Sequence, residues 1–264
     1  MTKAAQWQEI YEYGLVPAIF GPWSTKTVAL AVPNEGDYVL DVACGTGVVT
    51  RLAAQYIGTH GNVIGLDLNP GMVEVARSLP VPTDTSIDWQ VGDALMLPFP
   101  NATFHVVFCQ GGLQFVPDRL TALREMHRVL RPEGRLALMV CQHIQYCPGF
   151  AILVDKLTSH VGWQAATLLR MPFSLGDMEE LRSLMVKAGF QDVIIRPEVK
   201  MIRFPSPAKF VQSLITGSSI ADQVDESTMA KLITEASLEL QPFVKNDELS
   251  FPMGVHFAVA HTRD

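Results

Sequence analysis

In this 264-residue chain, the residues that most clearly suggest a ligand-binding site are a glycine-rich turn and a carboxylate that follows it. The run VLDVACGTG, residues 39–47, is typical of a short strand that ends at Asp41 and continues through Gly45-Thr46-Gly47 into a helix. Glycines there permit positive φ and let a ligand approach the backbone without a Cβ in the way. A second expected strand ends at Asp67, twenty positions after Gly47, where a carboxylate can accept hydrogen bonds from both hydroxyls of a ribose. The pattern predicts a nucleoside-bearing ligand at the carboxyl ends of parallel strands.

A third expected strand ends in Val91-Gly92-Asp93-Ala94. This places the Asp93 carboxylate and the Ala94 amide where the polar edge of an adenine could be read. The usual dinucleotide fingerprint has glycine or alanine three places after its second glycine, but Thr50 stands there. A nicotinamide dinucleotide is therefore an open but weakened alternative.

The elements that position these residues follow from an alternation of short β-rich runs with helical patterns. This alternation predicts a doubly wound, mostly parallel sheet with helices on both faces. Proline at the first position of 70–79 supports a helix start, and Pro132-Glu133-Gly134 predicts a turn before the fifth strand. The expected strands are 38–41, 62–67, 87–91, 104–110, 135–141, 193–204 and 253–260. The expected helices are 48–56, 70–79, 119–130, 178–188, 207–216 and 227–240.

We expect a single domain in four parts: a helical cap over residues 1–35, a ligand-binding core over 36–142, a lid over 143–177 and the remainder of the sheet with a helical insertion over 178–264. In the cap, Trp7, Tyr11 and Leu15 follow helical spacing, and Pro17 and Gly21-Pro22 are expected to break it. In the lid, apolar residues between 144 and 173 suggest one or two helices.

Taken in order, VLDVACGTG, GLDLNPGM, GDALMLPFPNATF and LREMHRVLRPEGRL resemble the motifs of class I S-adenosylmethionine-dependent methyltransferases. The nearest likeness is to the quinone-biosynthesis C-methyltransferases, and it is strongest over residues 36–142. YEYGLVPAIFGPW and FPMGVHFAVA look like the ends of a large bacterial methyltransferase group. The resemblance implies a Rossmann-like α/β fold with a seven-stranded sheet, S-adenosylmethionine as methyl donor and S-adenosylhomocysteine as product.

Carried over residue by residue, the resemblance places the glycine turn beneath the methionine part of the cofactor and Asp67 on its ribose. Leu68 and Met72 would pack on the adenine, although ordinary core packing is an open alternative for both. Gln110 and Gly111 would lie near the sulfonium. The segment Cys109-Gln110-Gly111-Gly112-Leu113-Gln114 departs from the quinone enzymes, which leaves the acceptor open. The full implied set is Asp41, Ala43, Gly45, Thr46, Gly47, Asp67, Leu68, Met72, Gly92, Asp93, Ala94, Gln110 and Gly111.

Aromatic and apolar residues of the cap and lid are the candidates for an acceptor pocket, with simple packing between cap and sheet as the competing interpretation. The candidates are Tyr11, Phe20, Gln114, His143, Trp163, Met171 and Phe173. His143 directly follows the fifth strand and is the candidate base, whereas proximity alone could suffice for an acceptor that enters ionised. His127 and His256 are expected to be structural, and His160 to be solvated surface.

The four cysteines allow a comparison with arsenite methyltransferases, but Cys109 and Cys141 fall within expected strands, where buried cysteine behaves as a small hydrophobe. We expect no metal site, because no His, Cys and carboxylate set has ligand spacing on one element.

The net charge and the length of the apolar runs limit the kinds of binding partner that we expect. Lys and Arg number 20 against 27 Asp and Glu, a net charge of −7 that argues against nucleic acid. No apolar run approaches the ~18 residues of a membrane span. We expect a cytoplasmic enzyme that methylates a small, largely apolar, aromatic or quinone-like acceptor at carbon or oxygen, with nitrogen also open. A homodimer is one of the open oligomeric states. The alternatives are an S-adenosylmethionine-binding protein without methyl transfer and an NAD-dependent oxidoreductase.

Overall fold

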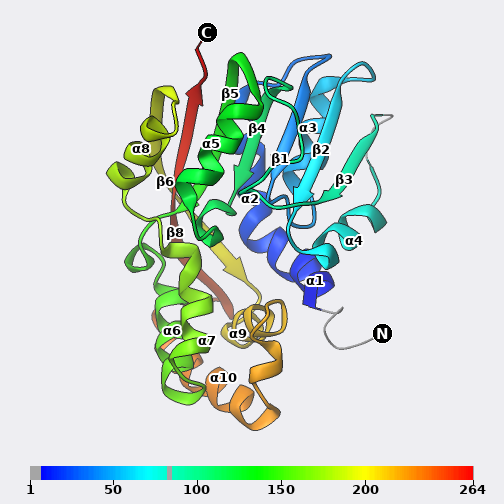
Figure 1. Cartoon of the computed structure of the whole chain (residues 1–264). Helices are drawn as coiled ribbons and strands as arrows, with labels where there is room; N and C mark the ends of the chain where they lie inside the picture. Colours follow the sequence, from blue (N-terminus) through cyan, green and yellow to red (C-terminus); the bar gives the residue numbers. More distant parts are fainter. Residues whose placement is uncertain (1–6, 82–84, 264) are drawn as a thin grey trace.

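The computed structural model describes residues 7–81 and 85–263 and centres on one sheet with helices on both faces (Figure 1). The strand order is β3-β2-β1-β4-β5-β8-β6, and the short β7 pairs with β8. The strands are β1 (Tyr38–Val42), β2 (Asn62–Asp67), β3 (Ile87–Val91), β4 (Phe104–Gln110), β5 (Leu130–Cys141), β6 (Gln191–Phe204), β7 (Val244–Lys245) and β8 (Glu248–His261). The predicted doubly wound sheet is confirmed, with β7 as an eighth strand that the sequence analysis missed.

Strands β1 to β5 are parallel, and β8 runs antiparallel between β5 and β6. Strand order reverses between β1 and β4, which is the position where open α/β sheets bind their ligands. The predicted turn at Pro132-Glu133-Gly134 lies within β5 as an irregularity. There the register on β4 shifts between Phe104 and Val106, and Glu133 has φ +59°. A local bulge therefore replaces a separate turn.

The helices form two layers. α2 and α3 share one apolar core with β1, β2 and β4, while α5 and α8 cover the opposite face of the sheet. The helices are α1 (Trp7–Ile10), α2 (Gly21–Ala31), α3 (Val48–Ile57), α4 (Pro70–Ser78), α5 (Arg119–Val129), α6 (Pro148–His160), α7 (Trp163–Arg170), α8 (Met178–Lys187), α9 (Pro207–Thr216) and α10 (Glu226–Leu240).

Side-chain caps explain several of the helix starts. Asn69 accepts hydrogen bonds from the amides of Gly71 and Met72 at the start of α4, and Asp177 accepts from Glu179 and Glu180 at the start of α8. Asp118, Ser206 and Asp225 cap α5, α9 and α10 in the same way. Each cap gives a partner to an amide that has none inside its helix.

The cap prediction at Pro17 is wrong, because the chain stays helical from Trp7 to Ala31. Residues Tyr11–Phe20 form a π-helix (η2) that contains Pro17, and the Gly21 amide donates to the Val16 carbonyl, five residues back. The wider turn avoids the i→i−4 clash that proline causes in an α-helix. Pro22 lies in the first turn of α2, where a missing N–H is harmless.

The β6–β8 ribbon extends beyond the carboxyl ends of the parallel strands. β8 pairs with β5 only as far as Cys141↔Val255, but with β6 it continues to Phe204↔Leu249. This extension carries α6, α7, α9 and α10, which we call the helical lobe and which the parallel arrows point toward in Figure 1. The two lid helices that were predicted are α6 and α7.

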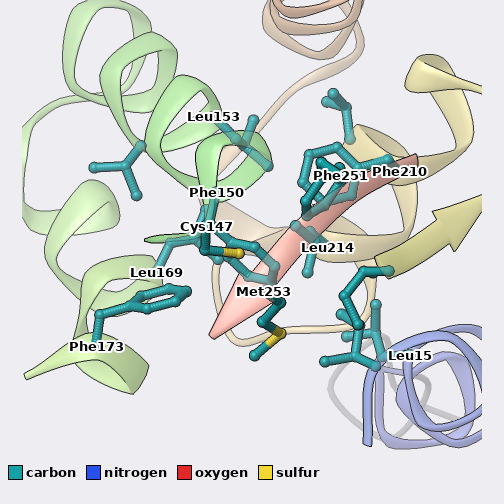
Figure 2. Close-up of a cluster of buried hydrophobic side chains, with 14 of the residues drawn as sticks. Leu15, Cys147, Phe150, Leu153, Leu169, Phe173, Phe210, Leu214, Phe251 and Met253 are labelled. Carbon is teal, nitrogen blue, oxygen red and sulfur yellow. The ribbon is translucent and has the colours of Figure 1, made fainter. Parts of the chain in front are cut away.

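An apolar core joins the helical lobe to the N-terminal helix. Phe150 of α6 packs edge-on against Phe173, Phe210 and Phe251, with ring centroids 5.2–6.5 Å apart (Figure 2). Leu15 of the π-helix belongs to the same cluster. Segments from both ends of the chain therefore form one hydrophobic body over the carboxyl edge of the sheet.

Candidate functional site

The glycine turn after β1 forms a cradle with no room for a side chain at Gly47. Gly47 has φ +86°, and a Cβ there would lie 2.1 Å from Cη2 of Trp89, whose ring packs under the turn. Gly45 has φ +56°, and its amide donates to Oδ2 of Asp67 over 2.8 Å. The turn is thus fixed from below by Trp89, which the sequence analysis missed, and from the side by Asp67.

The two predicted acidic residues lie at neighbouring strand ends. The other oxygen of Asp67 accepts from the Asn69 amide over 2.8 Å, and burial raises the pKa of this carboxyl. Asp93 follows β3, and its Oδ1 accepts from the Leu95 amide over 2.9 Å. Between them, Leu68 is 67% exposed while Met72 is 8% exposed. Leu68 is thus not a core residue, and the packing of both side chains on the adenine stays a prediction.

Asp41 lies beneath the turn rather than in it. Its carboxylate is buried and accepts from the Thr50 hydroxyl over 2.6 Å. Burial raises the pKa of Asp41 to about 7, against the lowering effect of the Thr50 hydrogen bonds. Thr50, the residue that weakens the dinucleotide fingerprint, thus has a structural task of its own.

The N-terminal helix lies over this cradle. A Cβ on Gly45 would be 3.8 Å from the Tyr11 hydroxyl, and one on Gly111 would be 3.6 Å from the Phe20 ring. Tyr11 and Phe20 stack with centroids 5.2 Å apart. Burial, followed by the charge of Asp67, raises the pKa of Tyr11, so its hydroxyl stays protonated. These two predicted pocket residues therefore lie over two of the predicted cofactor residues.

A polar clasp, formed by Glu12, Arg51 and the Thr46 carbonyl, holds the helix on the turn. Nη2 of Arg51 lies 3.3 Å from Oε1 of Glu12, and Nη1 donates to the Thr46 carbonyl over 2.6 Å. Glu12 Oε2 and Thr46 Oγ1 are buried without a hydrogen-bond partner in the described chain. Arg51 also lines a cavity of about 410 Å³ between α2 and α3. A cation one turn into the helix after the glycine turn was the available signal for this clasp.

Gln110 at the end of β4 has a role different from the predicted one. Its Oε1 accepts from the Thr27 hydroxyl over 2.5 Å, and its Nε2 donates to the Ser24 hydroxyl and the Phe20 carbonyl. The side-chain amide is fully used in tying α2 to the sheet. Only the Gln110 backbone and the adjoining Gly111 are left to face a ligand.

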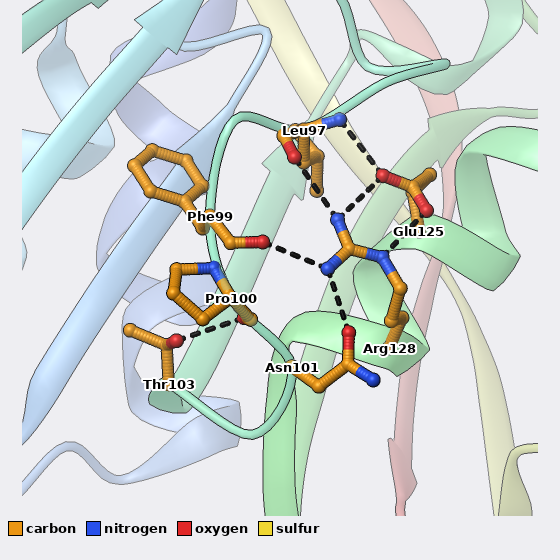
Figure 3. Close-up of polar contacts among 7 residues, drawn as sticks. All are labelled: Leu97, Phe99, Pro100, Asn101, Thr103, Glu125 and Arg128. Atoms are coloured by element: carbon orange, nitrogen blue, oxygen red, sulfur yellow. Dashed lines mark hydrogen bonds and ion pairs between the residues drawn. The ribbon is translucent and has the colours of Figure 1, made fainter.

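The loop that carries Asp93 is clamped by a residue of α5. Arg128 donates to the carbonyls of Leu97 and Phe99 and to Asn101, and it pairs with Glu125 through two contacts of 2.7 Å (Figure 3). Glu125 also accepts from the Leu97 amide over 2.8 Å. Leu97 and Phe99 belong to the motif GDALMLPFPNATF, and Glu125 and Arg128 belong to LREMHRVLRPEGRL. The clamp explains why these two motifs occur together, because the second fixes the loop of the first.

An open cavity of about 700 Å³ lies at the end of β5. His143, Met171 and Phe173 line it, which brings three predicted pocket residues together. Gln114 is buried behind the wall, and its Nε2 donates to the Pro172 carbonyl over 3.2 Å. The prediction for Trp163 is contradicted, because its side chain at the start of α7 is 69% exposed and lies outside this lining.

The other three histidines named in the sequence analysis and the four cysteines have structural contacts. His256 is buried with its Nε2 3.0 Å from the Gly176 carbonyl, and His127 packs edge-on against Phe190. His160, expected to be solvated, lies 2.9 Å from Glu235. All four cysteines are buried, and burial raises each thiol pKa, to about 12 for Cys109 and Cys141, which disfavours thiolate chemistry.

Residues 7–81 and 85–263 contain no cluster of three or more His, Cys, Asp or Glu suited to a metal ion. The same residues form no helix long and apolar enough to cross a bilayer. The expectation of a metal-independent reaction stays a prediction.

Comparison with known proteins agrees with this site. The methyltransferase domain family matches residues 40–138. The chain is 40% identical over 128 residues to 2-phytyl-1,4-naphtoquinone methyltransferase of Synechococcus elongatus, covering 48% of this chain and 54% of that protein. It is 31% identical over 191 residues to demethylmenaquinone methyltransferase of Staphylococcus epidermidis, covering 66% of this chain and 76% of that one. The fold resembles that of YcgJ from Bacillus subtilis, with a TM-score of 0.62 and 21% identity over 91% of this chain and 98% of that one.

The chain therefore belongs to the methyltransferase domain family, and its curated relatives include quinone methyltransferases. It spans about half the length of the first of these relatives. The resemblance inferred from the four motifs is confirmed.

The cradle also fits the cofactor of this family on its own geometry. Positive-φ glycines leave room at the turn, and Asp67 offers a carboxylate at the second strand end. The unpartnered oxygens of Glu12 and Thr46 are acceptors suited to an ammonium group.

Proposed function

We propose that this chain transfers a methyl group from S-adenosylmethionine to a small, largely apolar acceptor of quinone or phenol type. The observation that carries the proposal is the cradle of Gly45, Gly47, Asp67 and Asp93 at the switch point of the sheet, with an open cavity nearby at the end of β5. The quinone methyltransferases among the relatives support the acceptor class.

The residues have separable tasks. Asp67 and Asp93 would hold the ribose and the adenine edge, and the glycine turn would support the methionine part. When bound, the cofactor supplies a methyl group on a positively charged sulfur, which is already an activated electrophile. The protein then contributes mainly position, and positioning can supply ~7–11 kcal/mol of a barrier.

Tyr11 and Phe20 would exclude water from the end of the cradle near Gly111. Because burial keeps the Tyr11 hydroxyl protonated, Tyr11 acts as a hydrogen-bond donor and not as a base. His143 is exposed at the cavity and remains the candidate for deprotonating an acceptor. A base is optional for an acceptor that enters ionised.

A radiolabelled methyl-transfer assay with a panel of reduced naphthoquinone, phenol and amine acceptors tests the proposal. We expect label in a quinol or phenol product, and little label when Asp67→Ala replaces the wild type. S-adenosylhomocysteine binding without transfer to any acceptor would instead favour an S-adenosylmethionine-binding protein that does not methylate. Hydride transfer with NAD would favour the oxidoreductase alternative.

A further inference from the structure

The cavity at the end of β5 is lined by both apolar and polar side chains. The apolar members are Ile144, Met171 and Phe173. The polar members are His143, Gln145, Thr167, Arg170 and Ser174. A ligand that fills the cavity would therefore combine a ring or chain with a hydrogen-bonding group.

The charge of this lining is opposite to that of the chain. Asp and Glu exceed Lys and Arg by 27 − 20 = 7 over the whole sequence. Among the described residues, the cavity lining contains Arg170 and no carboxylate. Within the described part of the chain, the Arg170 side chain makes no ion pair and no hydrogen bond. Its guanidinium is thus free for an anion.

Acidic residues lie just after this lining in the chain, and Asp177 among them stays ionised because its partners are neutral amides that lower its pKa. The Asp177 carboxylate accepts from the amides of Glu179 and Glu180, each over 2.8 Å, and caps α8. Glu180 pairs with Arg119 over 3.2 Å, and Arg119 also donates to the Ser174 hydroxyl over 2.7 Å. Of the two arginines beside this cavity, Arg119 is neutralised by a partner and Arg170 is left open.

Hydrogen bonds connect the cavity wall to the strand end that faces the cofactor cradle. The Gly111 amide donates to the Met139 carbonyl over 2.8 Å, which fixes the end of β4 beside β5. Three residues on, Gln114 donates to the Pro172 carbonyl, and the Ser174 hydroxyl donates to the Gln114 carbonyl, both over 3.2 Å. A ring lying against Met171 and Phe173 is therefore close to the segment that follows β4.

From these contacts we infer that the methyl acceptor carries an acid group, bound by Arg170 at the cavity rim, on an apolar ring held by Met171 and Phe173. The inference rests on the proposed function and narrows its acceptor from a neutral quinol or phenol to an aromatic acid. A planar guanidinium matches a carboxylate through two parallel hydrogen bonds, whereas a neutral ring compound gains nothing from it.

The test compares 1-hydroxy-2-naphthoate with 1-naphthol, which differ by the carboxylate, in titrations of the full chain saturated with S-adenosylhomocysteine. We expect the acid to bind at least tenfold more tightly to the wild type. In Arg170→Gln the two probes should bind alike, with the affinity for 1-naphthol unchanged. Arg196→Gln is the matched control and should keep the wild-type preference. Arg196 is an exposed arginine on β6 outside the cavity lining, and it has no ion pair among the described residues.

Equal binding of the two probes to the wild type would overturn the inference, as would a preference that survives Arg170→Gln or binding of neither probe. None of these results touches the proposed function, which fails separately if S-adenosylhomocysteine does not bind or if no acceptor is methylated.

Discussion

Asp67 has both of its carboxylate oxygens engaged by backbone amides, one from the glycine turn and one from Asn69. The same carboxylate is the group expected to accept the ribose hydroxyls. Asp67→Ala should therefore raise the dissociation constant of S-adenosylhomocysteine tenfold or more, because charge-assisted hydrogen bonds worth ~1.5–3 kcal/mol each are lost. Calorimetric titration measures this, and a constant within twofold of wild type would reject the assignment. Asp93→Asn keeps the shape of the side chain, so it should lower the affinity for S-adenosylhomocysteine by less than Asp67→Ala does.

Asp41 makes a prediction about pH. Its pKa is raised from 3.8 to about 7 by burial, so the folded state binds this proton more tightly than the unfolded state. The free energy of unfolding should then fall as the pH rises from about 4 to about 7, by at most ~1.4 kcal/mol per pH unit from this group. Asp41→Asn should remove that part of the slope in urea titrations run across this range. Parallel profiles for the two proteins would contradict the burial argument.

At the scale of elements, the clasp determines whether the N-terminal helix stays on the glycine turn. Arg51→Met leaves the Glu12 carboxylate buried and unpaired, which should cost roughly 1–3 kcal/mol and loosen residues 8–20. Hydrogen exchange should become faster over that segment, and cofactor affinity should fall severalfold. The matched control is Glu239→Gln, which breaks the more exposed pair between Lys156 and Glu239 and should change stability by ~0.5 kcal/mol or less. Unchanged exchange over 8–20 in Arg51→Met would show that the clasp does not hold the helix.

The elements were predictable where local signals agree with the global fold. The strand ends at Asp67 and Val91 and the helix 207–216 were correct, because caps, prolines and apolar runs coincide there. The predicted helix break at Pro17 was wrong, because a π-helix accommodates this proline and packs its Leu15 side chain into the apolar core. The backbone partners of Arg51 and Arg128 were not predictable, because the positions of those carbonyls depend on the fold. Local spacing signalled only a part of these contacts: Arg51 follows the glycine turn by one helical turn, and Glu125 precedes Arg128 by three residues.

At the scale of the whole molecule, the chain that returns from α7 to α8 passes close to the residues after β5 at Gly176. A Cβ there would lie 2.3 Å from the His143 amide nitrogen and 2.7 Å from the Gln142 carbonyl carbon. Gly176→Ala should therefore displace the backbone where the lid rejoins the core at residues 174–177. It should lower the free energy of unfolding by ~1–3 kcal/mol and weaken the binding of 1-hydroxy-2-naphthoate at the cavity. Gly14→Ala is the control, because the nearest contact of its Cβ would be an ordinary 3.7 Å to Ser213 Oγ. Its melting temperature should equal that of the wild type or lie slightly above it. Equal melting temperatures for the two variants would contradict this account.

The whole account depends on which cofactor the cradle takes, and a calorimetric titration of the wild-type chain with S-adenosylhomocysteine, run beside one with NAD, tests this most directly. The cradle of Gly45, Gly47 and Asp67 at the switch point of the sheet predicts saturable, one-to-one binding of S-adenosylhomocysteine and no measurable heat with NAD. Saturable binding of NAD, or no binding of S-adenosylhomocysteine, would contradict the account at its centre.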